Sequence, residues 1–248
     1  MNAQKRKQII ITELSERGEV DIKALALSLD ISEITVRRDL NQMAADGLLY
    51  RTHGGAMKVN PLEIPHDFVH KAAKNTEAKD KICRAAAEQI DDGDIIFMDC
   101  GSTVYRLCQF IKNKRIKVIT NSIPVIFELQ NSRVSLNIIG GEFDTERQAM
   151  HGRVAHQHIS FYKATKAFLG VDGISPGGLF ANSELEADIT QAFAAHSAKT
   201  ILLCDETKIG KETYLRFADV DVINTIITNS KARDLAAFKK RGIEVISV

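Results

Sequence analysis

The first 45 residues contain three segments in which apolar residues recur with the spacing of an α-helix. The first segment spans residues 3–17 and stops at Gly18, and the other two begin after the capping residues Asp21 and Ser32. The inward-facing residues of the three segments are Ile10, Ile11 and Leu14, then Ile22, Leu25, Ala26 and Leu29, then Val36, Leu40, Met43 and Ala44. Two short helices joined by a tight turn cannot bury both stripes alone, so the pattern predicts a three-helix core.

The third helix carries polar and basic residues on the side opposite its apolar stripe. At about 100° per residue from Val36, the residues on or flanking that side are Ile34, Thr35, Arg37, Arg38, Asn41 and Gln42. Arginine, asparagine and glutamine can bond base edges or phosphates, and threonine or isoleucine can meet a thymine methyl group. A major-groove reading helix needs this arrangement. The alternative is a solvated helix whose arginines pair with Asp39 or Asp46.

A short hairpin is predicted after Gly47. Residues 48–51 have the composition of a strand, and residues 52–55, with the sequence THGG, are typical of a hairpin tip. We expect this hairpin to form a wing that carries Arg51 and His53 toward the DNA backbone or the minor groove.

The sequences SEITVRRDL at 32–40 and LLYRTHGGA at 48–56 resemble the N-terminal winged helix-turn-helix of the DeoR family of bacterial transcriptional regulators. The resemblance implies DNA contacts from the reading helix, from the wing at 51–55 and from a basic residue near the start of the chain; for that residue an ordinary exposed arginine is the alternative. The expected DNA-binding residues are Arg6, Ser32, Thr35, Arg37, Arg38, Asn41, Gln42, Arg51, His53 and Gly54.

From residue 94 onward, short apolar runs without polar alternation are separated by amphipathic segments. The runs expected as strands are 95–98, 117–120, 134–139, 167–171, 200–204, 224–228 and 244–248. The segments expected as helices are 76–90, 104–111, 124–130, 184–197 and 230–241. Such alternation predicts a parallel sheet with helices on its faces, and ligands of these sheets bind at the carboxyl ends of the strands.

The expected strand ends carry small and polar residues in the order DCGST, TNS, GG, DG and DETK. Glycine lets the backbone approach an anion, while hydroxyls and helix-start amides donate hydrogen bonds, so phosphate is the natural ligand. The expected effector-binding residues are Asp99, Gly101, Ser102, Thr103, Asn121, Ser122, Gly140, Gly141, Asp172 and Lys208. The alternatives are a simple helix cap for Ser102 or Thr103 and a surface lysine for Lys208.

This second half is also similar to the C-terminal domain of the DeoR family, which belongs with ribose-5-phosphate isomerase, glucosamine-6-phosphate deaminase and CoA-transferase folds. The resemblance implies that the domain senses a phosphorylated sugar or a related metabolite. Many members have a pattern nearer SxxGP where residues 150–153 here read MHGR. His151 and Arg153 therefore either contact an effector in a way specific to this chain or lie on the surface.

We therefore expect an α/β protein with a small N-terminal winged helix-turn-helix domain at 1–58 and a larger α/β domain at 76–248. The sheet of the larger domain should be mainly parallel, similar to the ribose-5-phosphate isomerase and CoA-transferase superfamily. A linker is expected at 59–75, where Pro61 and Pro65 interrupt any apolar periodicity.

Net charge, cysteine spacing and the length of apolar runs limit the classes of protein that the chain can belong to. The net charge of +1 argues against a generally basic nucleic-acid coat, so DNA attraction must come from where the charges lie. We expect a homodimer or higher homo-oligomer that binds paired half-sites. The four cysteines form no CxxC, which favours buried reduced thiols, and we expect no metal and no cofactor. No run approaches the roughly 20 apolar residues of a membrane span, so a cytoplasmic protein is expected.

The favoured interpretation is a DNA-binding regulator without enzymatic activity, most simply a repressor of a sugar-utilisation operon. Its partners would be double-stranded operator DNA and a phosphorylated sugar-type effector. One alternative is an enzyme acting on a sugar phosphate or acyl-CoA with an accessory winged-helix domain, although fold alone carries no chemistry. The other is a protein-interaction module that uses the winged domain to bind another protein.

Overall fold

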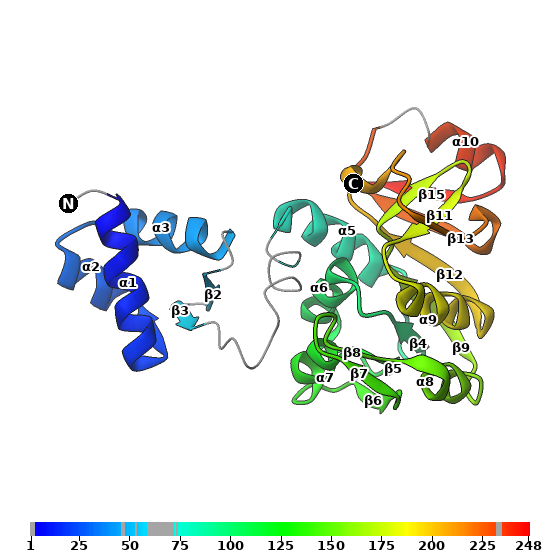
Figure 1. Ribbon diagram of the computed structural model, residues 1–248, viewed down its shortest axis with the longest axis horizontal. Coiled ribbons are helices and arrows are strands. Elements are labelled where there is room, and N and C mark those ends of the chain that lie inside the picture. The colour runs from blue at the N-terminus through cyan, green and yellow to red at the C-terminus, as the bar shows by residue number, and fades with distance from the viewer. Residues whose placement is uncertain (1–2, 46–47, 53, 59–71, 73, 232–234) are drawn as a thin grey trace. The chain divides into compact units, whose positions relative to one another are not determined.

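The computed structural model describes residues 3–45, 48–52, 54–58, 72, 74–231 and 235–248. The chain divides into two compact units, residues 1–74 and 75–248, which Figure 1 shows in blue-cyan and in teal to red. The predicted linker at 59–75 lies outside the described residues except for residues 72, 74 and 75. Among the described helices, none combines the length and the apolar composition that crossing a bilayer requires.

Three helices form the core of the N-terminal unit, as the apolar periodicity predicts: α1 (Ala3–Arg17), α2 (Ile22–Leu29) and α3 (Glu33–Ala45). Gly18 ends α1 with a φ of +79°, a conformation that glycine adopts without strain. The Asp21 carboxylate caps α2 by accepting from the amides of Lys23 and Ala24 at 2.8 and 3.0 Å. The side chains of Ile10, Leu25, Val36, Leu40 and Met43 are fully buried between the helices.

A three-stranded antiparallel sheet completes this unit in the order β1-β3-β2. Its strands are β1 (Glu19–Asp21), β2 (Leu49–Arg51) and β3 (Gly55–Lys58). The hairpin of β2 and β3 confirms the predicted wing, whereas β1 was not predicted because its three residues are too few to show a periodicity. Gly55 pairs with Asp21, and a Cβ atom on Gly55 would lie 1.8 Å from the Val20 carbonyl oxygen. Only glycine fits there.

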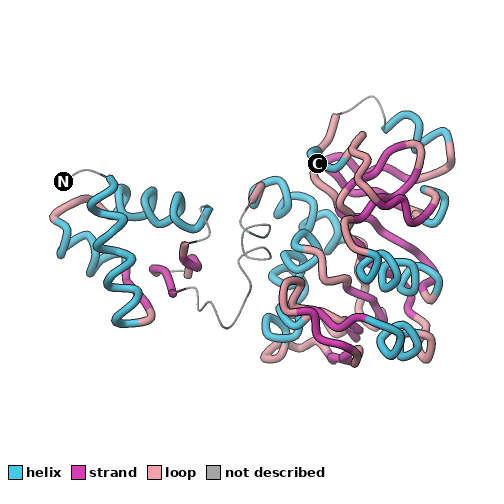
Figure 2. The backbone as a smooth tube through the Cα atoms, in the orientation of Figure 1, coloured by secondary structure: helices cyan, strands magenta, loops and turns pink. Residues whose placement is uncertain are grey.

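The C-terminal unit is built on a seven-stranded, entirely parallel sheet in the order β15-β14-β12-β9-β4-β5-β6. Figure 2 shows its strands in magenta with helices in cyan around them. The strands are β4 (Ile95–Met98), β5 (Lys117–Thr120), β6 (Ser135–Ile138), β9 (Ala164–Leu169), β12 (Ser197–Leu203), β14 (Thr225–Thr228) and β15 (Glu244–Ser247). From β4 the chain proceeds outward to β5 and β6, then returns to β9 on the other side. The strand order therefore reverses between β4 and β9, and open α/β sheets bind ligands at such a point.

Helices cover both faces of this sheet. The apolar side chains of α5 (Thr76–Glu88), α6 (Ser102–Ile111) and α7 (Ile123–Leu129) belong to one buried cluster, and those of α8 (Gly152–Ile159), α9 (Glu184–Ala195) and α10 (Leu235–Lys240) belong to another. Along β4, Ile96 and Met98 join the first cluster while Phe97 joins the second. Burial on both faces explains why the strands are continuous apolar runs.

Several elements differ from the expectation. The strands β9 and β12 each begin three residues earlier than predicted, because their first residues include lysines and small residues that break the apolar run. The predicted helix at 230–241 is described only from Leu235, since residues 232–234 are outside the described part. The elements that the sequence analysis did not predict include β7 (Glu142–Asp144), β8 (Ala149–His151), α8, β10 (Gly173–Ser175), β11 (Gly178–Ala181), β13 (Leu215–Ala218) and the 3₁₀ turns Glu206–Lys208 and Val220–Val222.

All four cysteines are buried free thiols, which confirms the prediction. Burial raises the pKa of Cys83 and of Cys204 to about 12, so these thiols stay protonated at neutral pH. Among the residues that the structure describes, no group of three or more His, Cys, Asp or Glu side chains could hold a metal ion.

Candidate functional site

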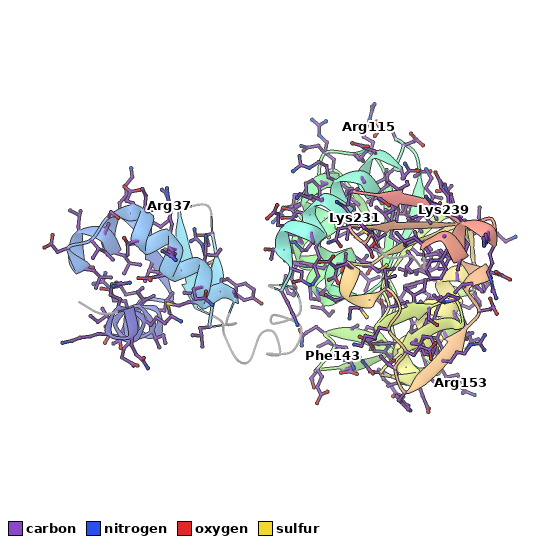
Figure 3. All side chains as sticks on the ribbon, turned by 90° about the horizontal axis from the view of Figure 1, so that it is seen from above. Arg37, Arg115, Phe143, Arg153, Lys231 and Lys239 are labelled. Atoms are coloured by element: carbon purple, nitrogen blue, oxygen red, sulfur yellow. The ribbon has the colours of Figure 1, made fainter. Side chains whose placement is uncertain are left out.

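The outer side of α3 has the accessibility that the sequence predicts. Ile34 is 78% exposed, and Arg37, Arg38, Asn41 and Gln42 are exposed. Figure 3 labels Arg37 where its side chain projects away from the helix. The helix begins as expected, because the Ser32 hydroxyl accepts from the Thr35 amide at 3.3 Å. A row of exposed donors and acceptors is therefore available along one helix face.

The wing is joined to this face through Arg51. Its Nε donates to Asn41 Oδ1 at 2.8 Å, and its guanidinium also donates to the Gly55 carbonyl oxygen. Partial burial and the nearby charge of Arg37 lower the pKa of Arg51. Positive charge from the helix and from the wing is thus concentrated on one surface, as phosphate binding requires.

Two ion pairs bear on the predicted DNA contacts. Arg37 pairs with Glu33 one helical turn earlier at 3.0 Å, and an exposed pair of this kind is worth only about 0–1 kcal/mol, so DNA can displace it. Arg6 pairs with Asp39 at 2.6 Å, and only 14% of the Arg6 side chain is exposed. Arg6 therefore ties α1 to α3, and its phosphate contact stays a prediction. The predicted contact of His53 lies outside the described residues.

In the C-terminal unit, the sheet order brings the predicted effector-binding residues to one edge. They follow the carboxyl ends of five neighbouring strands in the order β12, β9, β4, β5 and β6. At the point where the strand order reverses, Asp99 is buried and accepts from the amides of Cys100 at 2.7 Å and Gly170 at 3.2 Å and from the Thr190 hydroxyl at 3.3 Å. Asp99 therefore holds the β4 and β9 loops together, and burial raises its pKa.

The loop after β4 contacts a buried lysine that the sequence analysis missed. Lys79 of α5 is 5% exposed and its Nζ donates to the Ser102 hydroxyl at 3.1 Å. Ser102 is the first residue of α6, whose N-cap is Gly101 without a side-chain cap, so the helix-cap alternative does not hold for Ser102. The pKa of Lys79 is lowered to about 8, chiefly by burial and also by the nearby charges of Lys208 and Arg106, while the Asp205 carboxylate acts in the opposite direction.

Lys79 could have been found from one sequence signal. It occupies the apolar stripe of α5 at helical spacing from Ile82, Cys83 and Ala86, where a lysine is out of place. An amphipathic helix explains a lysine on its polar side but not one in the middle of its buried side.

Two carboxylates lie near the lysines at this edge, Asp172 beside Lys208 and Asp205 near Lys79. The distance from Lys208 Nζ to Asp172 Oδ1 is 3.7 Å. Asp205 accepts from the Thr207 amide at 2.9 Å and from Asn75 Nδ2 at 3.3 Å. Burial raises the pKa of Asp205, but these hydrogen bonds and the Lys79 charge lower it more, so Asp205 remains ionised. The lysines at this edge are thus partly balanced by fixed negative charge.

Other predicted residues have local structural roles. The Ser122 hydroxyl caps α7 by accepting from the Val125 amide, and the Gly140 amide donates to His158 Nδ1 at 3.1 Å. A Cβ atom on Gly141 would lie 2.5 Å from the His151 carbonyl oxygen, so glycine permits the close approach of β8 and α8. Effector contacts from these residues stay predictions.

His151 lies beside the strand ends, and several charged side chains are close to it. Only 1% of His151 is exposed, which excludes the surface alternative for this residue, whereas Arg153 is exposed. Burial lowers the pKa of His151, the nearby Asp99 and Asp144 raise it, and Arg147 lowers it. Arg147 forms an ion pair with Glu186 at 3.1 Å. Neither Arg147 nor Glu186 was predicted, because nothing local in the sequence links them.

Two family models match most of the chain. Residues 6–61 match the DeoR-like helix-turn-helix domain, and residues 74–230 match the DeoR C terminal sensor domain. The lactose phosphotransferase system repressor of Lactococcus lactis subsp. lactis is 35% identical over 93% of this chain and 92% of its own length. The HTH-type transcriptional regulator FruR of Bacillus subtilis (strain 168), described as uncharacterized, is 30% identical over 96% of both chains.

Among solved structures, ribose 5-phosphate isomerase A from Methanocaldococcus jannaschii is similar over 55% of each chain, with 17% identity and a TM-score of 0.41. The matches to both domain models span the reading helix, the wing and the strand-end residues described above. The chain belongs to the DeoR family of bacterial transcriptional regulators.

Proposed function

We propose that this protein is a repressor of a sugar-utilisation operon, and that a phosphorylated sugar bound at the carboxyl edge of its C-terminal sheet controls its affinity for operator DNA. The observation that carries this proposal is the hydrogen bond of the buried Lys79 ammonium group to the Ser102 hydroxyl at the start of α6, with Lys208 close enough to lower the pKa of Lys79. Two ammonium groups, a hydroxyl and the free amides of a helix N-terminus match the charge and the acceptor atoms of a phosphate group. The relatives named as lactose phosphotransferase system repressors support a sugar as the remainder of the ligand.

The effector acts through two states of the protein. The DNA-reading residues and the strand-end residues belong to different compact units, so the ligand changes operator affinity only by binding one state more tightly than the other. Coupling energies of this kind are about 1–3 kcal/mol, or roughly 5- to 150-fold in affinity. The proposal includes a cytoplasmic location and a homodimer that binds paired half-sites on the operator. A chain with a net charge of only +1 has little general attraction for DNA, so a single winged domain binds weakly.

The test measures operator binding and catalysis on one preparation. A mobility-shift assay on DNA upstream of the protein's own gene cluster is run while hexose 1-phosphates and 6-phosphates are titrated. We expect at least one of them to shift the operator affinity of the natural protein. The Lys208→Ala variant should bind the operator normally and lose that response, whereas Lys239→Ala, which removes an exposed lysine on α10 (Figure 3), should keep it.

The same preparation separates the regulator from the enzyme alternative. The relatives are named as a repressor in one case and as a transcriptional regulator in the other, and a regulator requires no turnover of its effector. Conversion of a sugar phosphate that Lys208→Ala abolishes, together with operator affinity that no phosphorylated sugar changes, would favour the enzyme.

A further inference from the structure

Two buried side-chain atoms near the strand ends lack hydrogen-bond partners. Within the part of the chain that the structure describes, Asn121 Oδ1 and His151 Nε2 are the buried polar side-chain atoms without one. Asn121 is fully buried and His151 nearly so. Leaving a buried polar atom unpaired costs about 1–3 kcal/mol, and such atoms in a native protein call for a specific explanation.

The other hydrogen bonds of these side chains define both atoms as acceptors. Asn121 Nδ2 donates to the Met150 carbonyl oxygen at 2.9 Å, which leaves the amide oxygen as the unpaired atom. His151 Nδ1 lies 3.3 Å from the Leu185 carbonyl oxygen. Because a carbonyl oxygen only accepts, we assign the proton to Nδ1, and Nε2 of the neutral ring then carries a lone pair.

Both acceptors lie beside the expected phosphate site. Met98 pairs with Thr120 across β4 and β5, so the loop that leads to Ser102 and the residue Asn121 leave adjacent strands at the same edge. The Met150 amide donates to the Asn121 carbonyl oxygen at 2.9 Å, which places His151 directly after the segment that contacts Asn121. The Asp99 carboxylate is close enough to His151 to raise its pKa against the effect of burial.

A pair of acceptors requires a ligand group that donates. Phosphate oxygens at neutral pH accept, so this pair disfavours a phosphate group and suits sugar hydroxyls, each of which has one donor. We propose that His151 Nε2 and Asn121 Oδ1 accept hydrogen bonds from two hydroxyl groups of the sugar, and that His151 thereby selects which phosphorylated sugar this protein senses. The inference rests on the proposed function, since the phosphate site positions the sugar beside this pair.

A hydroxyl fits this pair better than an amine does. An ammonium group needs a carboxylate to offset its burial. Both oxygens of the neighbouring Asp99 already accept from protein donors, and Oδ1 of Asp144 accepts from the amides of Glu146 and Arg147. Arg147, which lowers the pKa of His151, adds a positive charge that opposes a second one. Glucose 6-phosphate and glucosamine 6-phosphate differ by this one group and serve as paired probes.

The experiment compares two substitutions at His151 with one on α8, the helix that follows it. His151→Phe keeps an aromatic ring but removes both ring nitrogens, whereas His151→Gln offers an amide oxygen in place of Nε2. His156→Phe makes the same change at a half-exposed histidine that pairs with Asp188. Dissociation constants are measured for hexose 1- and 6-phosphates, for monodeoxy analogues of the tightest hexose phosphate, and for inorganic phosphate, which occupies the phosphate site alone and reports that the variant is folded.

We expect His151→Phe to weaken the tightest hexose phosphate by about 10- to 100-fold and inorganic phosphate by less than about twofold. His151→Gln and His156→Phe should stay within about threefold of the natural protein. The deoxy analogue that lacks the hydroxyl bound by His151 should bind the natural protein weakly. His151→Phe should not weaken the binding of that analogue further, because the interaction between the two groups is already absent.

Three results separate the possible failures. Unchanged hexose phosphate binding by His151→Phe, with inorganic phosphate still bound, would overturn this inference and leave the proposed function standing. Tighter binding of glucosamine 6-phosphate than of glucose 6-phosphate would overturn the hydroxyl assignment. Failure of the natural protein to bind inorganic phosphate or any hexose phosphate would overturn the proposed function and this inference with it.

Discussion

The two units place their functional side chains in opposite environments. On the N-terminal unit, the candidate DNA contacts other than Arg6 come from one helix and one hairpin within residues 32–54, and those on the outer side of α3 are exposed. In the C-terminal unit, Lys79, Asp99, Asn121 and His151 are buried and come from segments spread over more than 70 residues. DNA is large and meets an outer surface, whereas a small effector must be surrounded to be recognised.

This difference has an electrostatic consequence. Burial lowers the pKa of Lys79 to about 8 and raises the pKa of Asp99, so the effector unit holds charged groups at a cost in stability. Exposed arginines on α3 carry no such cost. Substitutions on the reading surface should therefore alter DNA binding alone, while substitutions at the strand ends should alter both effector binding and stability.

We expect the largest effect from a substitution at Gly55, a crowded glycine of the N-terminal unit, and it should alter DNA binding but not effector binding. In Gly55→Ala the new Cβ atom would lie 1.8 Å from the Val20 carbonyl oxygen, so β1 must move away from β3. We expect operator affinity to fall more than about 100-fold and the N-terminal unit to lose at least about 1–3 kcal/mol of unfolding free energy. Binding of hexose phosphates should be unchanged, which calorimetric titration measures.

Two further glycines serve as controls. A Cβ atom on Gly54 would make only an ordinary contact, 3.7 Å from the Asp21 carboxylate, so Gly54→Ala should unfold at the same temperature as the natural protein. Gly141→Ala, which crowds the His151 carbonyl oxygen at 2.5 Å, should weaken hexose phosphates and spare operator affinity. Equal losses of DNA and hexose phosphate binding in both Gly55→Ala and Gly141→Ala would contradict the separation of the units.

The sequence predicted most of the N-terminal unit because its signals are local. The caps Asp21 and Ser32 and three helical stripes each lie within about 15 residues, and the structure confirms them. The strand β1 escaped notice because its only regular partner, β3, lies more than 30 residues away. The ion pair of Arg6 with Asp39 was missed for the same reason.

In the C-terminal unit, sequence reasoning could place residues at an edge but could not pair them. Because parallel strands end at a common edge, the loops after β4, β5, β6, β9 and β12 were expected to converge. The position of α5 against α6, which brings Lys79 to Ser102, depends on packing between helices and leaves no local pattern. The burial of His151 likewise depends on β8 and α8, which the sequence did not predict.

The second prediction concerns base reading by α3. Arg38→Ala should cost about 1–3 kcal/mol of specific operator binding, and the loss should vary with operator sequence if the contact is to a base. Arg37→Ala should cost less, because Arg37 must first leave Glu33. Arg17→Ala removes an exposed arginine at the end of α1 and should have little effect. The measurement is the equilibrium dissociation constant of each protein variant for a set of operator variants. Full operator affinity in both Arg37→Ala and Arg38→Ala would refute the assignment of α3 as the helix that contacts DNA bases.

The third prediction is a pH dependence of effector binding. In the free protein the pKa of Lys79 is about 8, and a bound phosphate dianion stabilises the ammonium form and raises it. The affinity for a hexose phosphate should therefore fall as pH rises above 8, by up to about tenfold per unit, and Lys79→Gln should flatten the profile. The phosphate itself loses its second proton near pH 6, so it stays dianionic in this range.

The free energy of unfolding of the effector-free protein should rise with pH in the range in which effector affinity falls. The unfolded chain, with a lysine pKa near 10.5, binds more protons than the folded protein between about pH 8 and 10.5. The contribution of Lys79 to the free energy of unfolding should therefore rise with pH in this window. Urea unfolding of the natural protein and of Lys79→Gln at pH 8 and pH 10 isolates that contribution. Equal pH profiles for the two proteins would show that Lys79 does not titrate there.

The smallest expected effect concerns Arg51, which links the wing to the reading helix. Its guanidinium is partly committed to Asn41 and to the Gly55 carbonyl oxygen, so we expect it to contact phosphate rather than a base edge. Arg51→Ala should weaken specific and nonspecific DNA together and reduce the slope of log affinity against log salt by roughly one unit, with selectivity intact. Arg51→Lys keeps the positive charge but lacks the guanidinium group that bonds Asn41. Its salt slope should therefore equal that of the natural protein, although the hydrogen bond to Asn41 is lost. If selectivity instead collapsed in Arg51→Ala while the salt slope stayed fixed, Arg51 would read a base, and the N-terminal unit would recognise sequence with its wing as well as with its helix.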